Sequence, residues 1–259
     1  MNIFVLGDVV GSGGCEIIRK HLPALKKLNS IDVCIANGEN SAVGNGITPY
    51  SADHLFTSGV DFITTGNHVF KKNEIYRYLD ENTHIIRPYN MNTSNPGKGT
   101  GIIDMGRVRI GIINLLGKAF MSASNDPFDA ADRALEEIED CKIKLVDFHA
   151  EATGEKRALA FYLDGRVSAF FGTHTHVQTA DAQVLPGGTA YITDLGMCGP
   201  ENSVLGVEPE AIIRSLRTGM PTRFTESEAP SFICGCIFEI DDKSGKAISA
   251  QSICKILFA

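Results

Sequence analysis

Short apolar runs alternate with amphipathic stretches along almost the whole chain. Early runs such as 31–36 are unbroken rather than alternating, which is typical of strands that are covered on both faces. Strands of this kind between amphipathic helices predict a layered α/β protein. We expect strands at 3–7, 31–36, 60–64, 84–87, 107–114, 142–148, 167–172, 189–193, 231–240 and 246–257. We expect helices at 14–28, 49–58, 71–80, 128–140, 153–163 and 208–218.

The size and composition are those of an ordinary globular protein. The 259 residues are 43% apolar and 21% charged, and they contain no fixed-period repeat or low-complexity tract, so we expect a single domain over residues 1–259. The 31 acidic residues outnumber the 24 basic ones, which argues against an extended nucleic-acid-binding surface.

No segment indicates export or a membrane. The first residues lack a basic region before an apolar core, so no signal peptide is expected. No apolar run approaches the ~18 residues of a membrane span. The seven cysteines contain no Cys-x-x-Cys pair and are expected as reduced, mostly buried thiols, including Cys234 and Cys236. We therefore expect a cytoplasmic protein, and a homo-oligomer would be unsurprising.

Side chains that commonly bind metals follow one predicted strand after another. In open α/β sheets the carboxyl ends of the strands form the ligand crevice, so these clusters are expected on one rim. The clusters are Gly7-Asp8, Asn37-Gly38-Glu39-Asn40, Gly66-Asn67-His68, Asp147-Phe148-His149 and Gly172-Thr173-His174-Thr175-His176.

The donor types in these clusters indicate a metal site. Carboxylate and amide oxygens suit hard cations, and imidazoles suit iron, zinc, manganese and nickel. Six or seven ligands exceed one tetrahedral site and fit two ions that share a bridging carboxylate. Such a pair can lower the pKa of a bridging water and hold a phosphoryl group during in-line displacement. The clusters contain no cysteine, which argues against structural zinc or an iron–sulfur centre.

Each cluster alone has a simpler interpretation. Asp8 could cap the predicted helix at 14–28. The pair His174 and His176 would point the same way on an extended backbone, although a structural role for the pair is open. The glycine-rich residues 7–14 match neither GxGxxG nor GxxxxGK[ST], which argues against a dinucleotide or P-loop site.

Taken together, the clusters resemble a known family. Gly66-Asn67-His68 and Gly172-Thr173-His174-Thr175-His176 resemble the Gly-Asn-His and Gly-His-Thr-His signatures of the calcineurin-like metallophosphoesterase superfamily. The wider arrangement resembles its bacterial YmdB-like branch, a group of small cyclic-nucleotide phosphodiesterases. This resemblance implies an α/β/β/α sandwich with mixed sheets and helices on the outer faces. The matching segments are 7–11, 37–40, 65–69, 147–151, 172–177 and 193–197.

Two positions depart from the superfamily pattern. Its first motif usually reads Asp-x-His, but Val10 occupies the third position, and Glu39 stands where an Asp is usual. Asn40 is the natural substitute for the missing His, as the branch resemblance also implies. The resemblance then assigns one metal to Asp8, Glu39, Asn40 and His176, and the other to Glu39 as bridge, Asn67, His149 and His174.

The resemblance implies hydrolysis of 2′,3′-cyclic nucleotides to phosphomonoesters by attack of a metal-bridging hydroxide. His68 is expected as the general acid for the leaving alkoxide, because it cannot easily share the metal of its neighbour Asn67. The ions are expected to be divalent or mixed-valence, with iron or manganese as first choices and zinc as an alternative. The alternatives are a phosphomonoesterase or protein phosphatase on the same scaffold, and a regulatory metal-binding protein with weak activity.

No segment of the sequence has a pattern that indicates binding of a nucleobase. The loops 41–50 and 196–206 follow motif segments and could form a small lid, or could be ordinary surface loops. Tyr50, Phe70 and Tyr89 are candidates for stacking on a base, although such aromatic residues are more often packing residues.

Overall fold

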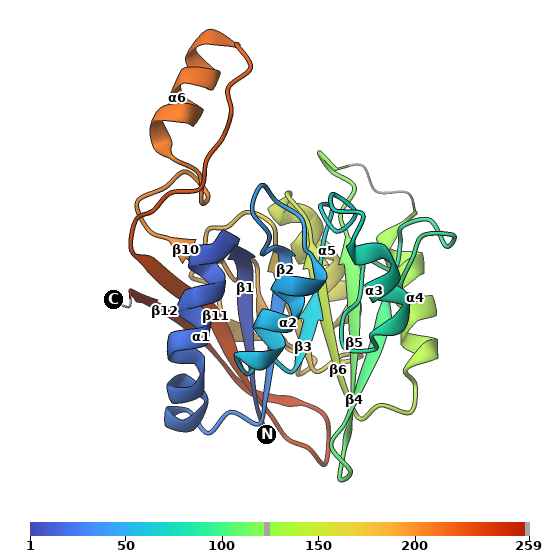
Figure 1. Cartoon of the computed structure of the whole chain (residues 1–259). Helices are drawn as coiled ribbons and strands as arrows, with labels where there is room; N and C mark the ends of the chain where they lie inside the picture. The colour runs from blue at the N-terminus through green and yellow to red at the C-terminus, as the bar shows by residue number, and fades with distance from the viewer. Residues whose placement is uncertain (122–124, 257–259) are drawn as a thin grey trace.

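The computed structural model describes residues 1–121 and 125–256, which form two packed six-stranded sheets (Figure 1). In the first sheet β1 is parallel to its neighbours β2 and β10 and antiparallel to β11. The order of this sheet is β12 (Ala247–Ile256), β11 (Ser231–Ile240), β10 (Met197–Pro200), β1 (Asn2–Val10), β2 (Val33–Asn40) and β3 (Phe62–Thr64).

The second sheet is also mixed. Its centre is a parallel run of three strands, β5 to β7, and β9 continues this run in the same direction. The strands at the two edges, β4 and β8, are antiparallel to their neighbours. The order is β4 (Thr100–Asp104), β5 (Arg109–Leu116), β6 (Ile143–His149), β7 (Ala169–Thr173), β9 (Ala190–Ile192) and β8 (Gln183–Val184).

Helices cover the outer face of each sheet (Figure 1). The first sheet is covered by α1 (Gly11–Leu28), α2 (Pro49–Thr57) and α3 (Ile75–Glu81), and the second by α4 (Pro127–Glu137) and α5 (Thr153–Leu163). Asp126 caps α4 by accepting the main-chain N–H groups of Phe128 and Asp129, which confirms the predicted start of this helix. Among the described residues, none of the helices combines the length and apolar character that crossing a lipid bilayer requires.

Alternate residues of β1 lie in different core layers. Ile3 and Val5 belong to the cluster between the sheets, whereas Phe4 and Leu6 pack with the helices of the first sheet. Successive strand residues point to opposite faces, so a strand buried on both sides must be apolar throughout. This explains the unbroken apolar runs, and the predicted α/β/β/α sandwich with mixed sheets is confirmed.

Several segments differ from the expectation. Residues 84–87 form a single bridge through Ile85 in place of a strand. β4 was not among the expected strands. The segment 196–206, expected as a loop, contains β10, which is buried beside β1 and β11. β10 has only four residues and ends in Gly199-Pro200, so its strand conformation comes from its neighbours rather than from its own pattern. The last position of the predicted strand 246–257 lies outside the described residues.

Residues 205–226 leave the body as an arm that carries α6 (Pro209–Thr218), at the upper left of Figure 1. No residue of α6 is buried, and Ile213 and Leu216 are exposed. The root of the arm is held by a bridge between Val207 and Glu226. The arm therefore projects from a well-packed body but has a fixed base.

Candidate metal centre

All eight residues that the sequence predicted as ligands or catalyst lie together, where strands of the two sheets end. Parallel neighbouring strands end at the same edge of a sheet, and the packing of the two sheets brings both edges together. β1 contributes Asp8, β2 contributes Glu39 and Asn40, and β6 contributes His149; the segments after β3 and β7 contribute Asn67, His68, His174 and His176.

The first group of donors surrounds the buried ring of His149. Its Nε2 lies 3.0 Å from Glu39 Oε1, 2.9 Å from Asn67 Oδ1 and 3.1 Å from His174 Nδ1. One ring nitrogen cannot satisfy three such partners by hydrogen bonding alone. Two donors at right angles around an ion ~2.1 Å from each lie ~3.0 Å apart, so these spacings fit a shared metal ion. Glu39, His149 and His174 each present one donor atom within 4.8 Å of the others.

The second group consists of Asp8, Asn40 and His176. Asp8 Oδ2 accepts the main-chain N–H of His174 at 3.0 Å. Asp8 Oδ1 is buried without a hydrogen-bond partner among the described residues and lies 3.8 Å from His176 Nε2. An unsatisfied buried acceptor costs about 1–3 kcal/mol, and more when it is charged. A cation within reach of both side chains would remove this cost, so this group also fits a metal ion.

Asn40 lies between this group and His68. Its amide nitrogen donates to Glu39 Oε1 at 3.2 Å and lies 3.3 Å from His176 Nε2. Its amide oxygen faces His68 Nδ1 at 2.9 Å. The oxygen is therefore engaged by His68, and a half-turn of the amide group would be needed to direct it toward His176.

Hydrogen bonds behind two of the rings fix which nitrogen faces the centre. Thr173 Oγ1 donates its proton to Asp147 Oδ1 at 2.7 Å and lies 2.9 Å from His149 Nδ1. The hydroxyl has only one proton, so His149 Nδ1 is the donor in that contact. His176 Nδ1 donates to the carbonyl oxygen of Leu205 at 3.1 Å. Both neutral rings would thus present the lone pair of Nε2 to the centre, as metal-binding histidines commonly do.

The backbone after β7 is not extended. His174 and His176 have φ angles of 101° and 65°, in the left-handed region that non-glycine residues rarely adopt. The expectation of two rings side by side on an extended strand end is therefore wrong, although both rings reach the centre. Each such residue costs about 1–3 kcal/mol, and it persists only where the surroundings impose it. The contact of the His174 N–H with Asp8 is one such restraint.

A buried ion pair supports the same turn. Lys156 of α5 is fully buried, and its Nζ donates to Asp194 Oδ2 at 2.7 Å and to the carbonyl oxygen of Thr173 at 2.9 Å. Asp194 Oδ2 also accepts the main-chain N–H of Thr175 at 3.2 Å. These contacts hold Thr173 and Thr175, the residues on both sides of His174.

Charges within the cluster set the protonation states. Burial raises the pKa of Asp8. Burial acts in the same direction on Glu39, but the charge and hydrogen bond of His149 outweigh it and lower the Glu39 pKa to about 2. Burial lowers the pKa of His149, but Glu39 outweighs that effect and raises it to about 9. Burial and then His149 lower the pKa of His174 to about 4. At neutral pH Glu39 is therefore ionised and His174 is neutral. His149 is protonated on both ring nitrogens and is positively charged.

We expect metal binding to release about one proton at pH 7.5. The raised pKa of His149, about 9, keeps the ring protonated at this pH, and the ring must lose the proton before Nε2 can bind a metal. The apparent affinity should fall ~10-fold for each pH unit below that pKa. Calorimetric titration with Mn²⁺ in two buffers of different ionisation enthalpy measures the number of protons. The control variant His84→Gln, which changes an exposed histidine, should release the same number of protons. If neither the parent chain nor this variant releases a proton, His149 is not protonated in the metal-free protein.

Several supporting residues were not singled out from the sequence. Asp147, Thr173 and Asp194 stand inside the matched motifs but were not given roles, and their position beside the ligands was the available signal. Glu151, whose Oε2 lies 3.2 Å from His174 Nε2, was in the same situation. Lys156 gave no signal, because a lysine in an amphipathic helix is normally an exposed residue.

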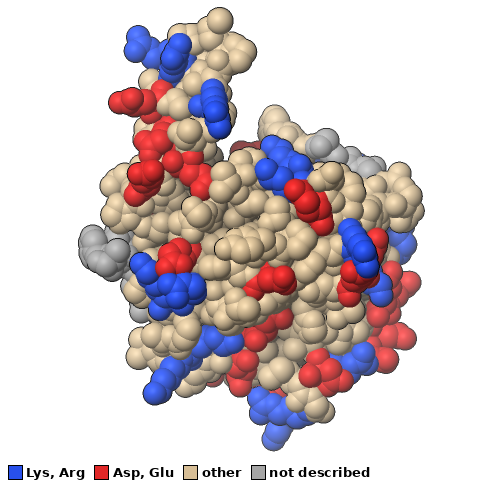
Figure 2. Space-filling model, in the orientation of Figure 1, with Lys and Arg blue, Asp and Glu red and all other residues tan. Residues whose placement is uncertain are grey.

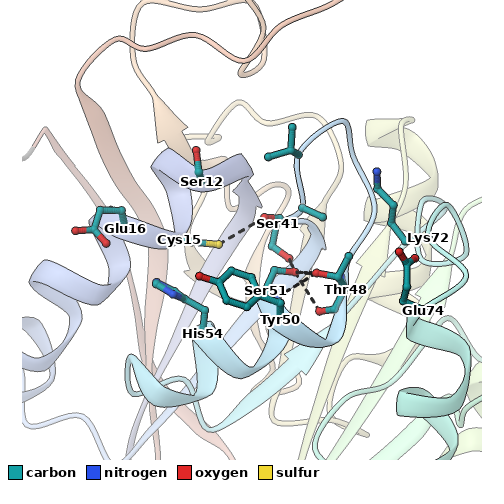
Figure 3. Close-up of a pocket in the computed structure, with 12 residues that line it drawn as sticks. Ser12, Cys15, Glu16, Ser41, Thr48, Tyr50, Ser51, His54, Lys72 and Glu74 are labelled. Atoms are coloured by element: carbon teal, nitrogen blue, oxygen red, sulfur yellow. Dashed lines mark hydrogen bonds between the residues drawn. The ribbon is translucent and has the colours of Figure 1, made fainter.

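Each aromatic residue suggested for base stacking has its own surroundings in the structure. Tyr50 is 81% exposed and lines a cavity of about 480 Å³ between α1, α2 and the loop after β2, with His54 among its neighbours (Figure 3). Phe70 packs edge-on against Tyr76 at 5.5 Å. Tyr89 donates its hydroxyl proton to a carboxylate of α4 at 2.7 Å.

Comparison with known proteins decides the family. A family model for YmdB-like proteins matches residues 4–253. The chain belongs to the YmdB-like family. The resemblance seen in the sequence is thereby confirmed, and the donor cluster described above is the candidate metal site of a YmdB-like protein.

Relatives and solved structures agree with this assignment. The chain is 43% identical to the 2′,3′-cyclic-nucleotide 2′-phosphodiesterase of Bacillus subtilis, over 98% of this chain and 96% of that protein. A crystal structure from Mycoplasma pneumoniae, described as a novel phosphatase, has a TM-score of 0.93 at 37% identity and covers 99% of this chain and 93% of that one. The NAD nucleotidase of Haemophilus influenzae has a TM-score of 0.59 at 14% identity, over 100% of this chain and 56% of that chain, which shows the fold alone.

Proposed function

We propose that this YmdB-like protein is a metal-dependent phosphodiesterase that opens 2′,3′-cyclic nucleotides to phosphomonoesters. The observation that carries the proposal is the convergence of two carboxylates and three imidazoles on adjoining points, with Asp8 Oδ1 buried and unpaired among the described residues. The name of the Bacillus subtilis relative supports the substrate class. A cation pair and a phosphodiester also complement each other in charge.

Two ions are proposed rather than one, because the donors fall into two groups. Glu39 Oε1 adjoins both groups, at 3.0 Å from His149 Nε2 and 3.2 Å from the amide nitrogen of Asn40. This position supports Glu39 as the bridge. Asp8, Asn40 and His176 would then complete the coordination of one ion. Asn67, His149 and His174 would complete the coordination of the other. When bound, the ions would polarise phosphoryl oxygens and lower the pKa of a coordinated water.

The donor set favours iron or manganese, with zinc as the alternative. It combines carboxylate and amide oxygens with imidazoles and contains no thiolate, so the softest metals are disfavoured. The seven cysteines are free, and none belongs to the cluster.

His68 is proposed as the proton donor to the leaving oxygen. Its ring is 24% exposed at the edge of the cluster, whereas His149 is fully buried within it. Asn40 holds its Nδ1, and Glu39 Oε1 lies 3.6 Å away. The ring is thus fixed beside the metal centre while it still reaches solvent, as a general acid requires.

A substrate panel on freshly purified protein, with its metal content measured in parallel, tests the proposal. We expect about two ions per chain and hydrolysis of 2′,3′-cyclic AMP to 3′-AMP. The panel should include 3′,5′-cyclic AMP, 2′-AMP, 3′-AMP and a phosphoserine peptide. Turnover of the monoesters or the peptide without turnover of the cyclic diester would favour a phosphatase instead.

A further inference from the structure

A cavity of about 590 Å³ opens beside the metal centre, between the loop after β2 and the root of the arm. Asn40 of the centre lines it directly. Leu205 also lines it, and the carbonyl oxygen of Leu205 holds the ring of His176. The volume lies within the ~300–1,000 Å³ typical of small-molecule sites. A group attached to a phosphate at the centre would have this space available to it.

The wall that the arm contributes is fixed to the body. Glu226 accepts the main-chain N–H of Ser12 at 3.3 Å and its hydroxyl proton at 3.4 Å, at the start of α1. The main-chain N–H of Glu208 donates to the carbonyl oxygen of Thr225 at 3.0 Å, which joins the two strands of the arm at its root. Arg223 and Phe224, which immediately precede Thr225, therefore line the cavity from an anchored segment.

Two cations line the cavity from its two sides. Lys71 lies next to the turn that carries His68, since its main-chain N–H donates to the His68 carbonyl oxygen at 2.9 Å, and Arg223 belongs to the arm. Within the described part of the chain, no ion pair engages either cation. The whole chain has a formal charge of -7, and in Figure 2 acidic side chains gather over the lower part of the arm while basic ones lie nearer its tip. Glu226 is the one acidic residue among the described residues that line the cavity, so the two cations leave the lining with a net positive charge, which favours an anion.

Several apolar side chains also line the cavity, and Phe224 and Val43 come from different segments. Phe224 of the arm is 51% exposed, and Val43 of the loop after β2 is 69% exposed. Both side chains therefore offer apolar surface that a bound base could cover, and stacking on an aromatic side chain suits any nucleobase.

We propose that this cavity binds the nucleoside part of the substrate, with Phe224 and Val43 against the base and Lys71 and Arg223 offsetting the charge of the phosphate. The inference rests on the proposed function and extends it to specificity. The residue proposed to stack on the base is thus Phe224 of the arm, in place of Tyr50, Phe70 and Tyr89.

Two substrates separate contacts to the base from contacts to the phosphate. One is 2′,3′-cyclic AMP, and the other is methyl ribofuranoside 2′,3′-cyclic phosphate, which has the same reacting group but no base. We expect Phe224→Ala to raise KM ~10-fold for the nucleotide only. We expect Arg223→Ala to raise KM for both. Leu216→Ala and Arg217→Ala, matched changes at exposed positions of α6, should leave both KM values unchanged.

A binding measurement keeps this inference separate from the proposed function. Calorimetric titration of the manganese-loaded protein with 3′-AMP needs no turnover, and Phe224→Ala should bind ~10-fold more weakly than the parent chain. Equal binding by the two proteins, or an equal rise in KM for both substrates in Phe224→Ala, overturns the assignment of the base site. If the cyclic diester is not hydrolysed but the difference in 3′-AMP binding is found, the cavity assignment stands and only the reaction is wrong.

Discussion

Glu39→Gln is expected to lose bound metal and phosphodiesterase activity together. The side chain is fully buried, and its Oε1 contacts donors of both groups. The amide keeps the shape of the carboxylate but removes the negative charge that a bridge between two cations needs. Metal ions contribute several kcal/mol of transition-state stabilisation, so kcat/KM should fall ~10³-fold or more. Elemental analysis should show the loss of at least one ion per chain.

A graded control distinguishes loss of the bridge from general disturbance of the site. Glu151 is 50% exposed and contacts His174 Nε2 from outside the cluster. Glu151→Gln should therefore reduce metal affinity by only ~10–100-fold, as loss of a supporting contact typically does. Thermal unfolding of both variants checks that they fold. Full metal occupancy in a folded Glu39→Gln protein would refute the bridging role.

The sequence could predict some parts of the site and not others. The ligands follow strands whose apolar runs are unmistakable, and parallel strands deliver their ends to one edge, so convergence follows from the pattern. The backbone of the turn after β7 does not follow from it. His174 and His176 adopt positive φ angles, and Lys156, far along the chain, supports them through Asp194. Such contacts depend on how two distant segments pack.

The fold shows the same division between local pattern and tertiary context. The amphipathic pattern predicted α6 correctly as a helix, but such a pattern normally means packing against a sheet, whereas no residue of α6 is buried. β10 is the converse case, since its four residues look like a turn and are buried between β1 and β11. The root of the arm lines the cavity beside the metal centre, and no pattern in the sequence places Phe224 there.

His68→Ala is expected to lower kcat by ~10²–10⁴-fold while metal content stays near that of the parent chain. The substitution removes the ring but keeps the main-chain N–H, which donates to Glu39 Oε2 at 2.9 Å and so continues to orient the bridge. Asn40 loses the partner of its amide oxygen, which leaves that oxygen free to turn toward the centre. The expected defect therefore lies in proton delivery and not in metal binding.

The leaving group provides the decisive readout for this variant. An alkoxide needs a proton as it departs, whereas p-nitrophenolate departs readily without one, so His68→Ala should hydrolyse methyl p-nitrophenyl phosphate with a much smaller loss than 2′,3′-cyclic AMP. His84→Ala, at an exposed histidine outside the cluster, should match the parent chain on both substrates. Equal losses on the two esters would argue that His68 positions the substrate and donates no proton. Loss of metal from His68→Ala would make the residue a ligand, because a general acid can be removed without emptying the site.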